Sequence, residues 1–580
     1  MKKFISGLIV CSFLTLTSIA QVSNTWSVKF SDAITTRYTP TINAMTSKGW
    51  EYSNTIILHG MEKVYNNVST AAYLNYIKAY VDTYVNGSGV ITASLVSLDR
   101  IHPGISCLFL YEQTGLLKYK TAATTLRNVL VGPSATYSKT SNGIFWHKLA
   151  GYDNVVMLDG IYMAHPFLAK YGRLFNDAAA MDTAINQTLF VYSQLYDPIK
   201  HLIKHAWNSD HTDTWADPVT GNSSEVWSRA MGWYMMALVD ILKYVPPSHP
   251  KRASLIAALA NLAIGVKTYQ DATTKLWFQV VDRGTGLTNN YIETSGSAMF
   301  VYSLKVASDS GWISSSTYMP VAQSAWTALK NTEIDTYTDG KPRINNFAPA
   351  MSVQTSAANY VQATLQPVDC PVVSGTQHPH GYAAILMAAS VMEFPLITLP
   401  VHFISFTARP LDDKIRLTWE NGDETDVDHY EVERSLNGND FTVIGNTRAT
   451  GLAKYTFDDN SNPVNRTVYY RIKAISIDGS AHYSGILPVR QKGSGASLQV
   501  SPNPVLDGNI NIVLNSIDPG KYKLKIVNSA GIIVSTMAVT INDDGNSVIS
   551  VLLPASAGKG LYYVQLEGND VKMNKSILVK

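Results

Sequence analysis

The segment Gly151–Gly172, GYDNVVMLDGIYMAHPFLAKYG, is apolar enough to lie inside a large helical domain, yet it carries the carboxylate Asp159. Removing a lone carboxylate from water costs several kcal/mol unless the group is paired or keeps its proton. A carboxyl group that stays protonated near neutral pH can serve as a general acid. Gly160, directly after it, equally favours a capping or turn aspartate. Taken alone, the segment therefore leaves a catalytic acid and a structural cap both open.

Around this segment, apolar residues recur at helical spacing from about residue 30 to residue 395. The spacing predicts twelve helices, separated by loops rich in Gly, Asn, Ser and Pro, over residues 32–47, 54–67, 70–86, 99–114, 117–130, 153–171, 176–195, 223–244, 249–270, 291–308, 315–331 and 379–394. Twelve alternating helices are typical of an (α/α)6 barrel, in which six outer helices surround six inner ones.

Residues of unusual chemistry fall on the even-numbered helices of this series, mostly near the N-terminal ends. They are Asp99 on the fourth helix, Asp159 on the sixth, Trp227 and Arg229 on the eighth, Glu293 and Ser295 on the tenth, and His378 and His380 before the twelfth. If the even helices are the inner, parallel ones, these side chains converge on one mouth of the barrel. Helix N-termini offer free N–H groups and a positive dipole end there, which favour an anionic ligand.

The pattern changes near residue 396. Residues 415–419 and 430–434 alternate apolar and polar side chains, as half-buried strands do. We expect a β-sandwich over residues 398–492 and a second, smaller one over residues 497–580. Lys492–Gly495 reads as a flexible linker between them. The predicted fold class is thus multidomain, with an all-α (α/α)6 barrel over residues 25–395 followed by two small all-β sandwich domains.

The first residues and the overall composition bound the class of protein. Residues 1–20, MKKFISGLIVCSFLTLTSIA, have the basic start, apolar run and small final residues of a secretory signal peptide. The net charge of +2 gives no support for a nucleic-acid partner. Cys107 and Cys370 lack metal-ligand spacing, and two buried thiols are favoured over a disulfide between them. Abundant aromatic residues suit a sugar-binding cleft, although a large core would contain them too.

Five motifs in the helical region carry a family resemblance. They are Ser97–Gly104, Phe145–Gly172, Val226–Leu238, Tyr291–Leu304 and, less closely, His378–Ala388. In this order they resemble the unsaturated rhamnogalacturonyl hydrolases of glycoside hydrolase family 105, which are close kin of family 88. The resemblance covers nearly the whole helical domain, and it implies the same (α/α)6 barrel that the helix count predicts.

The resemblance also implies roles for individual residues. In catalysis it matches Asp159 to the catalytic aspartate and Asp99 to a second carboxylate. The substrate-binding side chains that it implies are Lys148, near the residue that meets the substrate's carboxylate, together with His205, Trp227, Arg229 and Trp233.

Structural roles compete with several of these assignments. His205 could be a satisfied core histidine, and core packing is as good an interpretation of Trp233 as a sugar contact. Glu293 and Ser295 are better interpreted as a helix N-terminus than as part of the site. Pro379 and His380 depart from the family pattern, which puts contacts from the last loop in doubt.

Members of the family act on the unsaturated uronic acid that lyases leave at a non-reducing end. The resemblance implies hydration of its C4=C5 enol ether, with Asp159 giving a proton to C4 and then activating the water that adds at C5. Burial should raise the pKa of Asp159 for this task. Asp99 either shares a proton with Asp159 or binds sugar hydroxyls. No metal or other cofactor is implied.

We therefore expect an unsaturated rhamnogalacturonyl hydrolase whose partner is an oligosaccharide with an unsaturated uronic acid end. One alternative is the same chemistry on unsaturated glucuronyl ends from ulvan or glycosaminoglycans. Another is a secreted glycan-binding protein without catalysis. The β regions resemble a fibronectin-type-III-like module (Leu417–Phe441) and a sorting domain of the type IX secretion machinery (Val500–Ile512 and Lys572–Lys580). They predict a protein at the cell surface or outside the cell.

Overall fold

The computed structural model describes residues 25–580 apart from 47, 371–378, 395–402, 412–413, 422–426, 439, 451, 453, 462–466, 477–480, 491–496, 507, 516, 518–519, 542–546, 555–556 and 569–570. The predicted signal peptide, the predicted linker and His378 lie outside the described residues. The chain divides into two compact units, Met1–Leu399 and Pro400–Lys580, and each is considered by itself.

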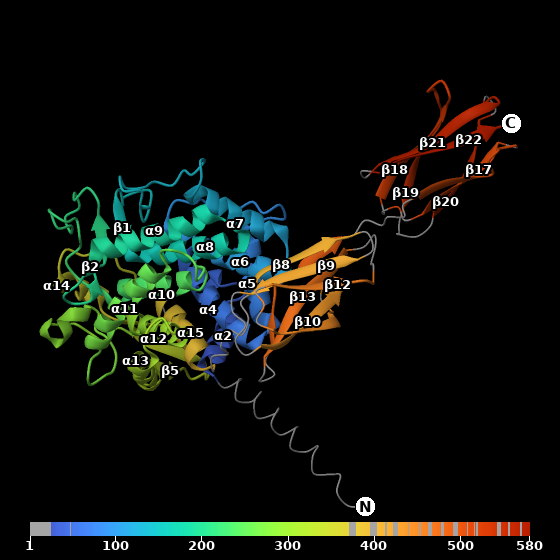
Figure 1. The fold of residues 1–580 in the computed structure, drawn as a ribbon. Coiled ribbons are helices and arrows are strands. Elements are labelled where there is room, and N and C mark those ends of the chain that lie inside the picture. The colour runs from blue at the N-terminus through green and yellow to red at the C-terminus, as the bar shows by residue number, and fades with distance from the viewer. Residues whose placement is uncertain are drawn as a thin grey trace, which may run out of the picture. The chain divides into compact units, whose positions relative to one another are not determined.

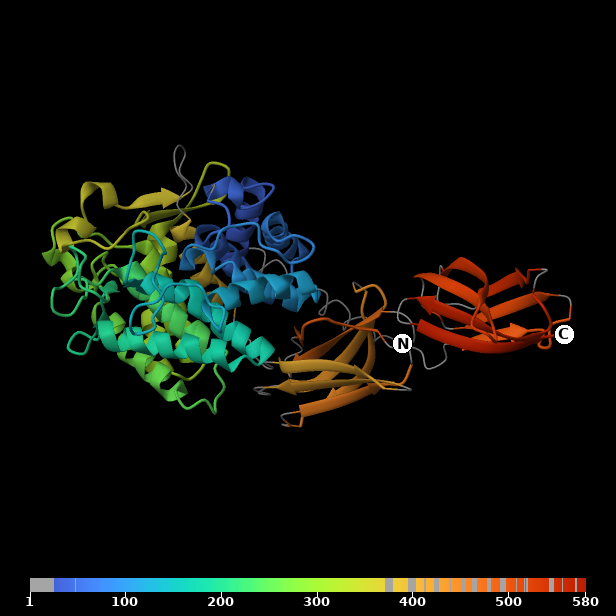
Figure 2. The ribbon, with the colours of Figure 1, turned by 90° about the horizontal axis from the view of Figure 1, so that it is seen from above.

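The first unit contains a closed ring of helices (Figure 1; Figure 2 gives a perpendicular view). The inner helices are α4 (Tyr52–Val68), α6 (Gly104–Thr114), α8 (Leu158–Phe175), α10 (Ser228–Leu242), α12 (Thr294–Asp309) and α15 (His380–Met392). Each inner helix contacts the next, and α15 packs against α4, which closes the ring. The outer helices are α2 (Trp26–Arg37), α5 (Ala71–Tyr84), α7 (Leu117–Leu130), α9 (Ala178–Leu195), α11 (Arg252–Thr268) and α13 (Ser315–Ala328). Each outer helix packs against at least one inner helix, and most of them contact two, so the predicted (α/α)6 barrel is confirmed.

Burial separates the two rings. Every residue of α10 is buried, as expected for a helix with protein on all sides. On the outer helix α11, the buried residues recur at helical spacing, from Leu255 through Ala258, Leu259 and Leu262 to Val266. The even-numbered helices of the sequence prediction are therefore the inner ones.

Four predicted helix starts are wrong by five or six residues. The sixth and eighth predicted helices, expected from residues 153 and 223, begin at Leu158 and Ser228. The first predicted helix, 32–47, is instead α2, which ends at Arg37, followed by the short α3 (Asn43–Thr46). Pro40 lies between them and cannot continue a helix. The fourth predicted helix was expected from Asp99, but Asp99 lies in a 3-10 turn, η1 (Leu98–Arg100), and α6 begins only after Pro103.

The loops at the barrel mouth contain short elements that the helical pattern did not predict. They are β1 (Val155–Met157), β2 (Tyr196–Asp197), β3 (Leu202–Ile203), β4 (Ala206–Asn208) and η2 (Val281–Gly286). The connection from α13 to α15 is the longest of these additions. It comprises η3 (Leu329–Glu333), β5 (Ile334–Thr336), β6 (Pro342–Phe347), α14 (Ala357–Tyr360), η4 (Ala363–Leu365) and β7 (Val368–Cys370), with β5, β6 and β7 paired in one sheet.

The second unit is all-β and antiparallel, with two separate hydrophobic cores. Its first strands are β8 (Phe403–Pro410), β9 (Ile415–Asn421), β10 (Val427–Ser435), β11 (Thr442–Arg448), β12 (Lys454–Asp459), β13 (Thr467–Ser476), β14 (Ala481–Tyr483) and β15 (Leu487–Arg490). They form the sheet β12-β9-β8 and a five-stranded sheet built on β10 and β13. Trp419, Tyr430 and Val468 lie in their shared core.

The remaining strands are β16 (Ser497–Ser501), β17 (Asn509–Asn515), β18 (Gly520–Asn528), β19 (Ile533–Ile541), β20 (Ser547–Leu552), β21 (Gly560–Gly568) and β22 (Val571–Val579). They form the sheets β16-β17-β20 and β19-β18-β21-β22 around Ile512, Leu524 and Val564. The predicted order of a helical barrel followed by all-β domains is confirmed.

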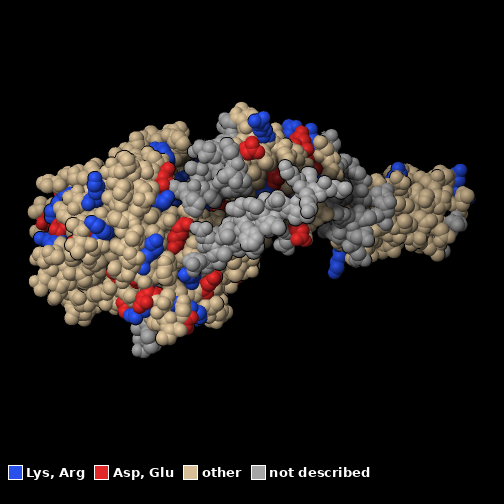
Figure 3. Space-filling model, turned by 90° about the horizontal axis from the view of Figure 1, so that it is seen from below, with Lys and Arg blue, Asp and Glu red and all other residues tan. Residues whose placement is uncertain are grey.

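Three further observations concern the whole described chain. None of the helices in its described part has the length and apolarity needed to cross a membrane. Cys107 and Cys370 are both buried and are not joined to each other by a disulfide. On the face shown in Figure 3, basic and acidic side chains of the helical unit are interspersed among uncharged ones, in keeping with the small net charge.

Candidate active site

A cavity of about 250 Å³ lies where the N-terminal parts of inner helices meet the mouth loops. Its lining comprises Tyr52, Asp99, His147, Lys148, Tyr152, Met157, Asp159, Met163, Ala350, Met351 and Ser352. The volume is just below the roughly 300–1,000 Å³ typical of sites for drug-sized ligands, so it suits about one sugar ring. Three of the predicted site residues, Asp99, Lys148 and Asp159, thus face one cavity.

A small backbone ladder brings these residues together. Ser97 and Lys148 form an antiparallel bridge, and the Leu98 amide donates to the His147 carbonyl at 3.0 Å. On its other side, the His147 amide donates to the Val155 carbonyl at 2.8 Å. Val155 begins β1, which runs directly into α8 and places Asp159 in the first turn of that helix.

Asp99 is buried and faces two nitrogen-bearing side chains. Its Oδ2 lies 3.5 Å from Nζ of Lys148, and its Oδ1 lies 3.8 Å from Nε2 of His147. Burial is the largest influence and lowers the pKa of Lys148, but the contacts with Asp99, Tyr152 and Glu51 together outweigh burial and raise that pKa above its ordinary value. Lys148 is 37% exposed on its side chain, so it is a charged ammonium group that a ligand in the cavity can reach.

Asp159 faces His205 from the opposite side of the cavity wall. Its Oδ2 lies 3.4 Å from Nε2 of His205, which is fully buried. Burial raises the pKa of Asp159, as predicted, but the contact with His205 and the electrostatic influence of His205, His147 and Arg229 together outweigh burial. The pKa of Asp159 therefore lies below its ordinary value, contrary to the raised pKa that was expected.

The two carboxylates do not form a pair. Among the described residues, Asp99 has ionic contacts to Lys148 and His147, whereas Asp159 has one to His205. His147 lies close enough to both carboxylates for each of them to raise its pKa, although burial lowers that pKa further and leaves it below its ordinary value. Of the two roles expected for Asp99, this arrangement favours contact with sugar hydroxyls over a shared proton.

His205, Trp227 and Arg229 form a layer behind the cavity instead of lining it. The ring centroid of Trp227 lies 4.8 Å from that of His205, and the Arg229 guanidinium lies 4.7 Å from the Trp227 ring. All three side chains are almost completely buried. From this position each of them contacts and supports a neighbouring group of the protein. Their predicted contacts with the substrate stay predictions.

Arg229 holds the loop that forms one wall of the cavity. Its guanidinium donates to the carbonyls of Ala348, at 2.6 Å, and Pro349. The amide of Ala348 donates in turn to Oε1 of Glu293 at 2.9 Å. Glu293 is also the N-cap of α12, where it accepts from the amides of Ser295 and Gly296, so its predicted capping role is confirmed. The next residues of this loop, 350–352, line the cavity.

Trp233 lies in the barrel core. Its ring is 2% exposed and stacks on Tyr162 with centroids 4.9 Å apart and an interplanar angle of 26°. Tyr162 in turn contacts His59 and Asp240, which are buried inner-helix residues. Trp233 therefore packs in the core, as one of its two interpretations predicted, and its ring does not line the cavity.

Several cavity residues were not predicted. His147 directly precedes Lys148 within one motif, and this adjacency is the sequence signal that points to it as a cavity residue. Tyr52 opens α4 and its hydroxyl lies 2.9 Å from Nε2 of His380, so His380 contributes behind the wall despite its departure from the family pattern. Met351 and Tyr152 come from loops, whose sequence carries no periodic signal.

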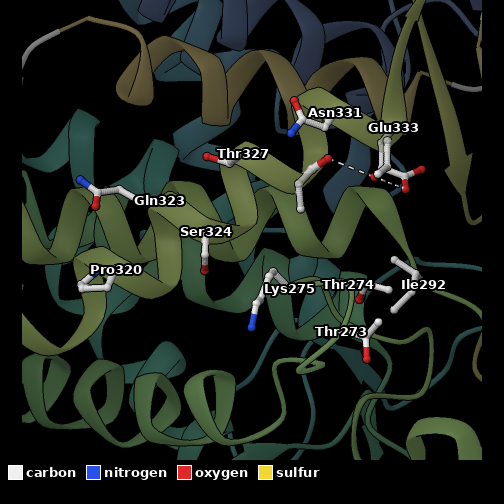
Figure 4. Close-up of a pocket in the computed structure, with 12 residues that line it drawn as sticks. Thr273, Thr274, Lys275, Ile292, Pro320, Gln323, Ser324, Thr327, Asn331 and Glu333 are labelled. Carbon is white, nitrogen blue, oxygen red and sulfur yellow. Dashed lines mark hydrogen bonds between the residues drawn. The ribbon is translucent and has the colours of Figure 1, made fainter.

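A larger hollow of about 840 Å³ lies elsewhere in the helical unit (Figure 4). Its lining contains one carboxylate, Glu333, and one cation, Lys275. The Glu333 carboxylate already accepts hydrogen bonds from Thr294, Thr332 and Asn346. Because no second acid or base faces it there, the smaller cavity is the better candidate for catalysis despite its size.

Comparison with known proteins adds to this geometry. The model of Glycosyl Hydrolase Family 88 matches residues 26–394. The chain is 30% identical over 205 residues to the "24.9 kDa protein in picA locus" of Rhizobium radiobacter, which amounts to 35% of this chain and 86% of that protein. It is 25% identical over 177 residues to the "Unsaturated 3S-rhamnoglycuronyl hydrolase" of Formosa agariphila, 30% of this chain and 45% of that protein. A solved structure of a glycoside hydrolase from family 105 of C. acetobutylicum is similar with a TM-score of 0.58 and 29% identity, over 63% of this chain and 99% of that chain.

Proposed function

Because the chain belongs to Glycosyl Hydrolase Family 88, we propose that it removes the unsaturated galacturonyl residue from the non-reducing end of rhamnogalacturonan oligosaccharides. As a member of the family it is a glycosidase of the unsaturated uronyl hydrolase type. The identity of the polysaccharide is the further step that we propose. The observation that carries the proposal is one sugar-sized cavity that presents Asp159 and the reachable cation Lys148 together.

The chemistry follows from what these groups can exchange with an enol ether. The carboxyl proton of Asp159 adds to C4. The electron pair of the C4=C5 π bond forms the new C–H bond, and Asp159 is left as a carboxylate. Positive charge then develops at C5 and the ring oxygen. Water adds at C5 and gives its proton to Asp159, and the resulting hemiketal opens and releases the neighbouring sugar. One carboxyl group thus acts first as acid and then as base, and it ends the cycle protonated.

Binding of the substrate would supply the proton affinity that Asp159 needs as an acid, since the groups around it lower its pKa. The uronate brings a carboxylate into a cavity whose only lining cation among the described residues is Lys148. A second negative charge near Asp159 raises its pKa, because like charges disfavour the ionised form. We therefore propose that Asp159 acquires its proton on forming the complex. Asp99, held by Lys148, is left to accept hydrogen bonds from sugar hydroxyls.

The rim of the cavity favours an uncharged leaving sugar. Tyr152 and Met157 line the cavity, and Tyr152, Trp215 and Val353 pack in one apolar cluster with Val155 and Met157. Such a surface suits the methyl group and ring face of a 6-deoxy sugar such as rhamnose. Lys148 contacts Asp99 and would also bind the uronate. The described lining contains no second cation that could bind a sulfate group on the leaving sugar.

Three unsaturated disaccharides test the proposal, prepared by lyases from rhamnogalacturonan, ulvan and chondroitin. Hydration destroys the conjugated double bond, so loss of its ultraviolet absorbance measures each rate. We expect the highest kcat/KM on the rhamnogalacturonan product. Preference for the ulvan or chondroitin product would overturn the substrate while keeping the chemistry. Binding without turnover on all three would instead favour a glycan-binding protein.

We also propose that the second unit serves export. Residues 398–492 would act as a fibronectin-type-III-like spacer, and residues 497–580 as a type IX sorting domain. In support, the final strand β22 lies at the edge of its sheet, paired along one side with β21. The enzyme would then work at the cell surface or outside the cell, where the polysaccharide is.

A further inference from the structure

Tyr360 contacts the site from a segment that the sequence presented only as a loop. It is the last residue of α14, in the long connection between α13 and α15, and its side chain is completely buried. Its hydroxyl lies 2.7 Å from Nδ1 of His205, a residue 155 positions earlier in the chain. The other ring nitrogen of that histidine faces Asp159. The three side chains therefore form a row that ends at the acid.

The direction of the Tyr360 hydrogen bond can be deduced from its other partner. The backbone N–H of Gln354 donates to the Tyr360 hydroxyl oxygen at 3.4 Å, so that oxygen accepts there. Burial raises the pKa of Tyr360, so the hydroxyl keeps its hydrogen. Among the described residues, Nδ1 of His205 is the acceptor within reach of that hydrogen. Tyr360 therefore donates, and Nδ1 accepts with its lone pair.

A neutral imidazole carries one hydrogen, so accepting at Nδ1 places it on Nε2. This N–H faces Oδ2 of Asp159, with the two heavy atoms 3.4 Å apart. Both atoms are buried, and neither has a hydrogen-bond partner of normal geometry among the described residues. They are thus each other's available partner, and Oδ1 remains the oxygen that Asp159 presents to the cavity.

We propose that Tyr360 is a positioning residue that holds His205 in the Nε2–H form and thereby orients the carboxyl group of Asp159. With the other tautomer, a nitrogen lone pair would face Oδ2. That lone pair would repel the carboxylate and would draw the proton of the acid away from C4 of the substrate. The kinetic part of this inference rests on the proposed function, whereas the tautomer itself does not.

The surrounding contacts show that Tyr360 is held in place from two sides. Its backbone carbonyl accepts from Nε2 of Gln279 at 3.3 Å, and Oε1 of the same glutamine accepts from the indole N–H of Trp227 at 3.0 Å. Trp227 also lies against the His205 ring. The buried tryptophan that was expected to meet the sugar therefore connects the histidine with the segment that carries Tyr360.

The test compares Tyr360→Phe with Tyr291→Phe in the full chain. The Tyr291 hydroxyl donates to the Leu365 carbonyl at 2.9 Å, so the control removes a hydrogen bond to the same connection without touching His205. Nitrogen-15 shifts of labelled histidine report the tautomer directly, and the His205→Gln spectrum identifies the His205 signals. We expect the Nε2–H form in the unsubstituted protein and its partial loss in Tyr360→Phe only.

Turnover supplies the second measurement. In Tyr360→Phe we expect kcat to fall about tenfold to a hundredfold with little change in KM, because the acid is displaced while the cavity stays intact. An Nδ1–H or doubly protonated His205 in the unsubstituted protein would overturn the proposal even if Tyr360→Phe failed to fold. An unchanged His205 spectrum in Tyr360→Phe, or an equal change in Tyr291→Phe, would overturn it as well. Absence of turnover on every substrate would contradict the proposed function, while the spectra would still decide the tautomer.

Discussion

The two oxygens of Asp159 have different surroundings, and this difference sets its chemistry. Oδ2 is buried against His205, whereas the residue as a whole still lines the cavity. The N–H of His205 stabilises the carboxylate, which suits the base step and opposes the acid step. The substrate's own negative charge has to reverse that balance. Reactivity at this residue is therefore set by what occupies the cavity and not by burial alone.

Asp159→Asn should keep the fold and remove activity. The amide has nearly the same shape but can neither give a proton to C4 nor take one from water. General acid–base contributions are typically about a hundred- to ten-thousand-fold, and we expect a loss of kcat in that range. Asp182→Asn, at an exposed position on α9, is the matched control and should retain full activity. More than about a tenth of the original turnover in Asp159→Asn would remove this residue from the catalytic role.

The pH dependence should differ between the free enzyme and the complex. The acid step needs protonated Asp159, so the rate is highest below the relevant pKa and falls as the pH rises through it. In the free enzyme that pKa is lowered, by contacts that outweigh burial, and kcat/KM reports it. The bound uronate raises the pKa, and kcat reports the complex. We expect the decline of kcat to lie at higher pH than that of kcat/KM, and coinciding profiles would contradict substrate-induced protonation.

Among the elements that apolar periodicity does not predict, the connection between α13 and α15 contributes most to the site. Arg229 on α10 and Glu293 before α12 bind the two backbone polar groups of one residue, the carbonyl and the amide N–H of Ala348. These contacts join the connection to two adjacent inner helices. They place residues 350–352 on the cavity and Tyr360 beside His205.

Arg229→Gln should loosen this wall. The substitution leaves the buried carbonyls of Ala348 and Pro349 without donors, which costs about 1–3 kcal/mol of folding free energy for each. We therefore expect a lower Tm and, because the cavity wall is less well held, a higher KM. Hydrogen exchange over residues 348–361 should become faster. Arg252→Gln is the matched control, because Arg252 also donates to two carbonyls, those of Leu242 and Val245, but away from the cavity. A lower Tm with unchanged exchange in residues 348–361 would show that Arg229 does not hold the loop.

At the scale of the whole molecule, each part of the chain closes its own core. The helical core ends at Phe394, and the β regions have two further cores. Every described residue that lines the cavity belongs to the unit Met1–Leu399. Catalysis and the proposed export role are therefore assigned to different units.

A chain truncated after residue 395 should fold and turn over substrate with the kcat of the full protein, because it retains the complete barrel and every described cavity residue. Circular dichroism checks the fold, and the disaccharide assay checks activity. A soluble but inactive truncation would mean that the β regions contribute to the cleft, contrary to the domain boundaries that we infer.

Deleting residues 496–580 in the native host should leave an active enzyme inside the cell envelope. The predicted signal peptide would still direct the chain across the inner membrane, whereas the sorting domain would be missing. Fractionating the cells and assaying each compartment measures this, with the full chain as control. Activity of the truncated enzyme at the cell surface or in the medium would show that these residues form a passive β-sandwich.

Much of the fold was predictable from the sequence, because the signals are local. Apolar spacing predicted twelve helices, and the residues of unusual chemistry near the N-terminal ends of the even-numbered ones indicated that these are the inner helices. The change to two-residue alternation marked the start of the β domains. Asp159 could be singled out because a carboxylate in an apolar stretch needs a physical reason, and Asp99 because the family resemblance matches it to a second carboxylate.

What only the tertiary structure decided is which distant groups meet. Trp233 and Trp227 look alike in the sequence, yet one packs in the core and the other supports His205. Arg229 was interpreted as a ligand for a carboxylate, but its donors are satisfied by carbonyls more than a hundred residues away. The pKa of Asp159 depends on charges that three separate segments bring to it. Such contacts depend on how the chain closes in three dimensions, and no periodic pattern along it encodes them.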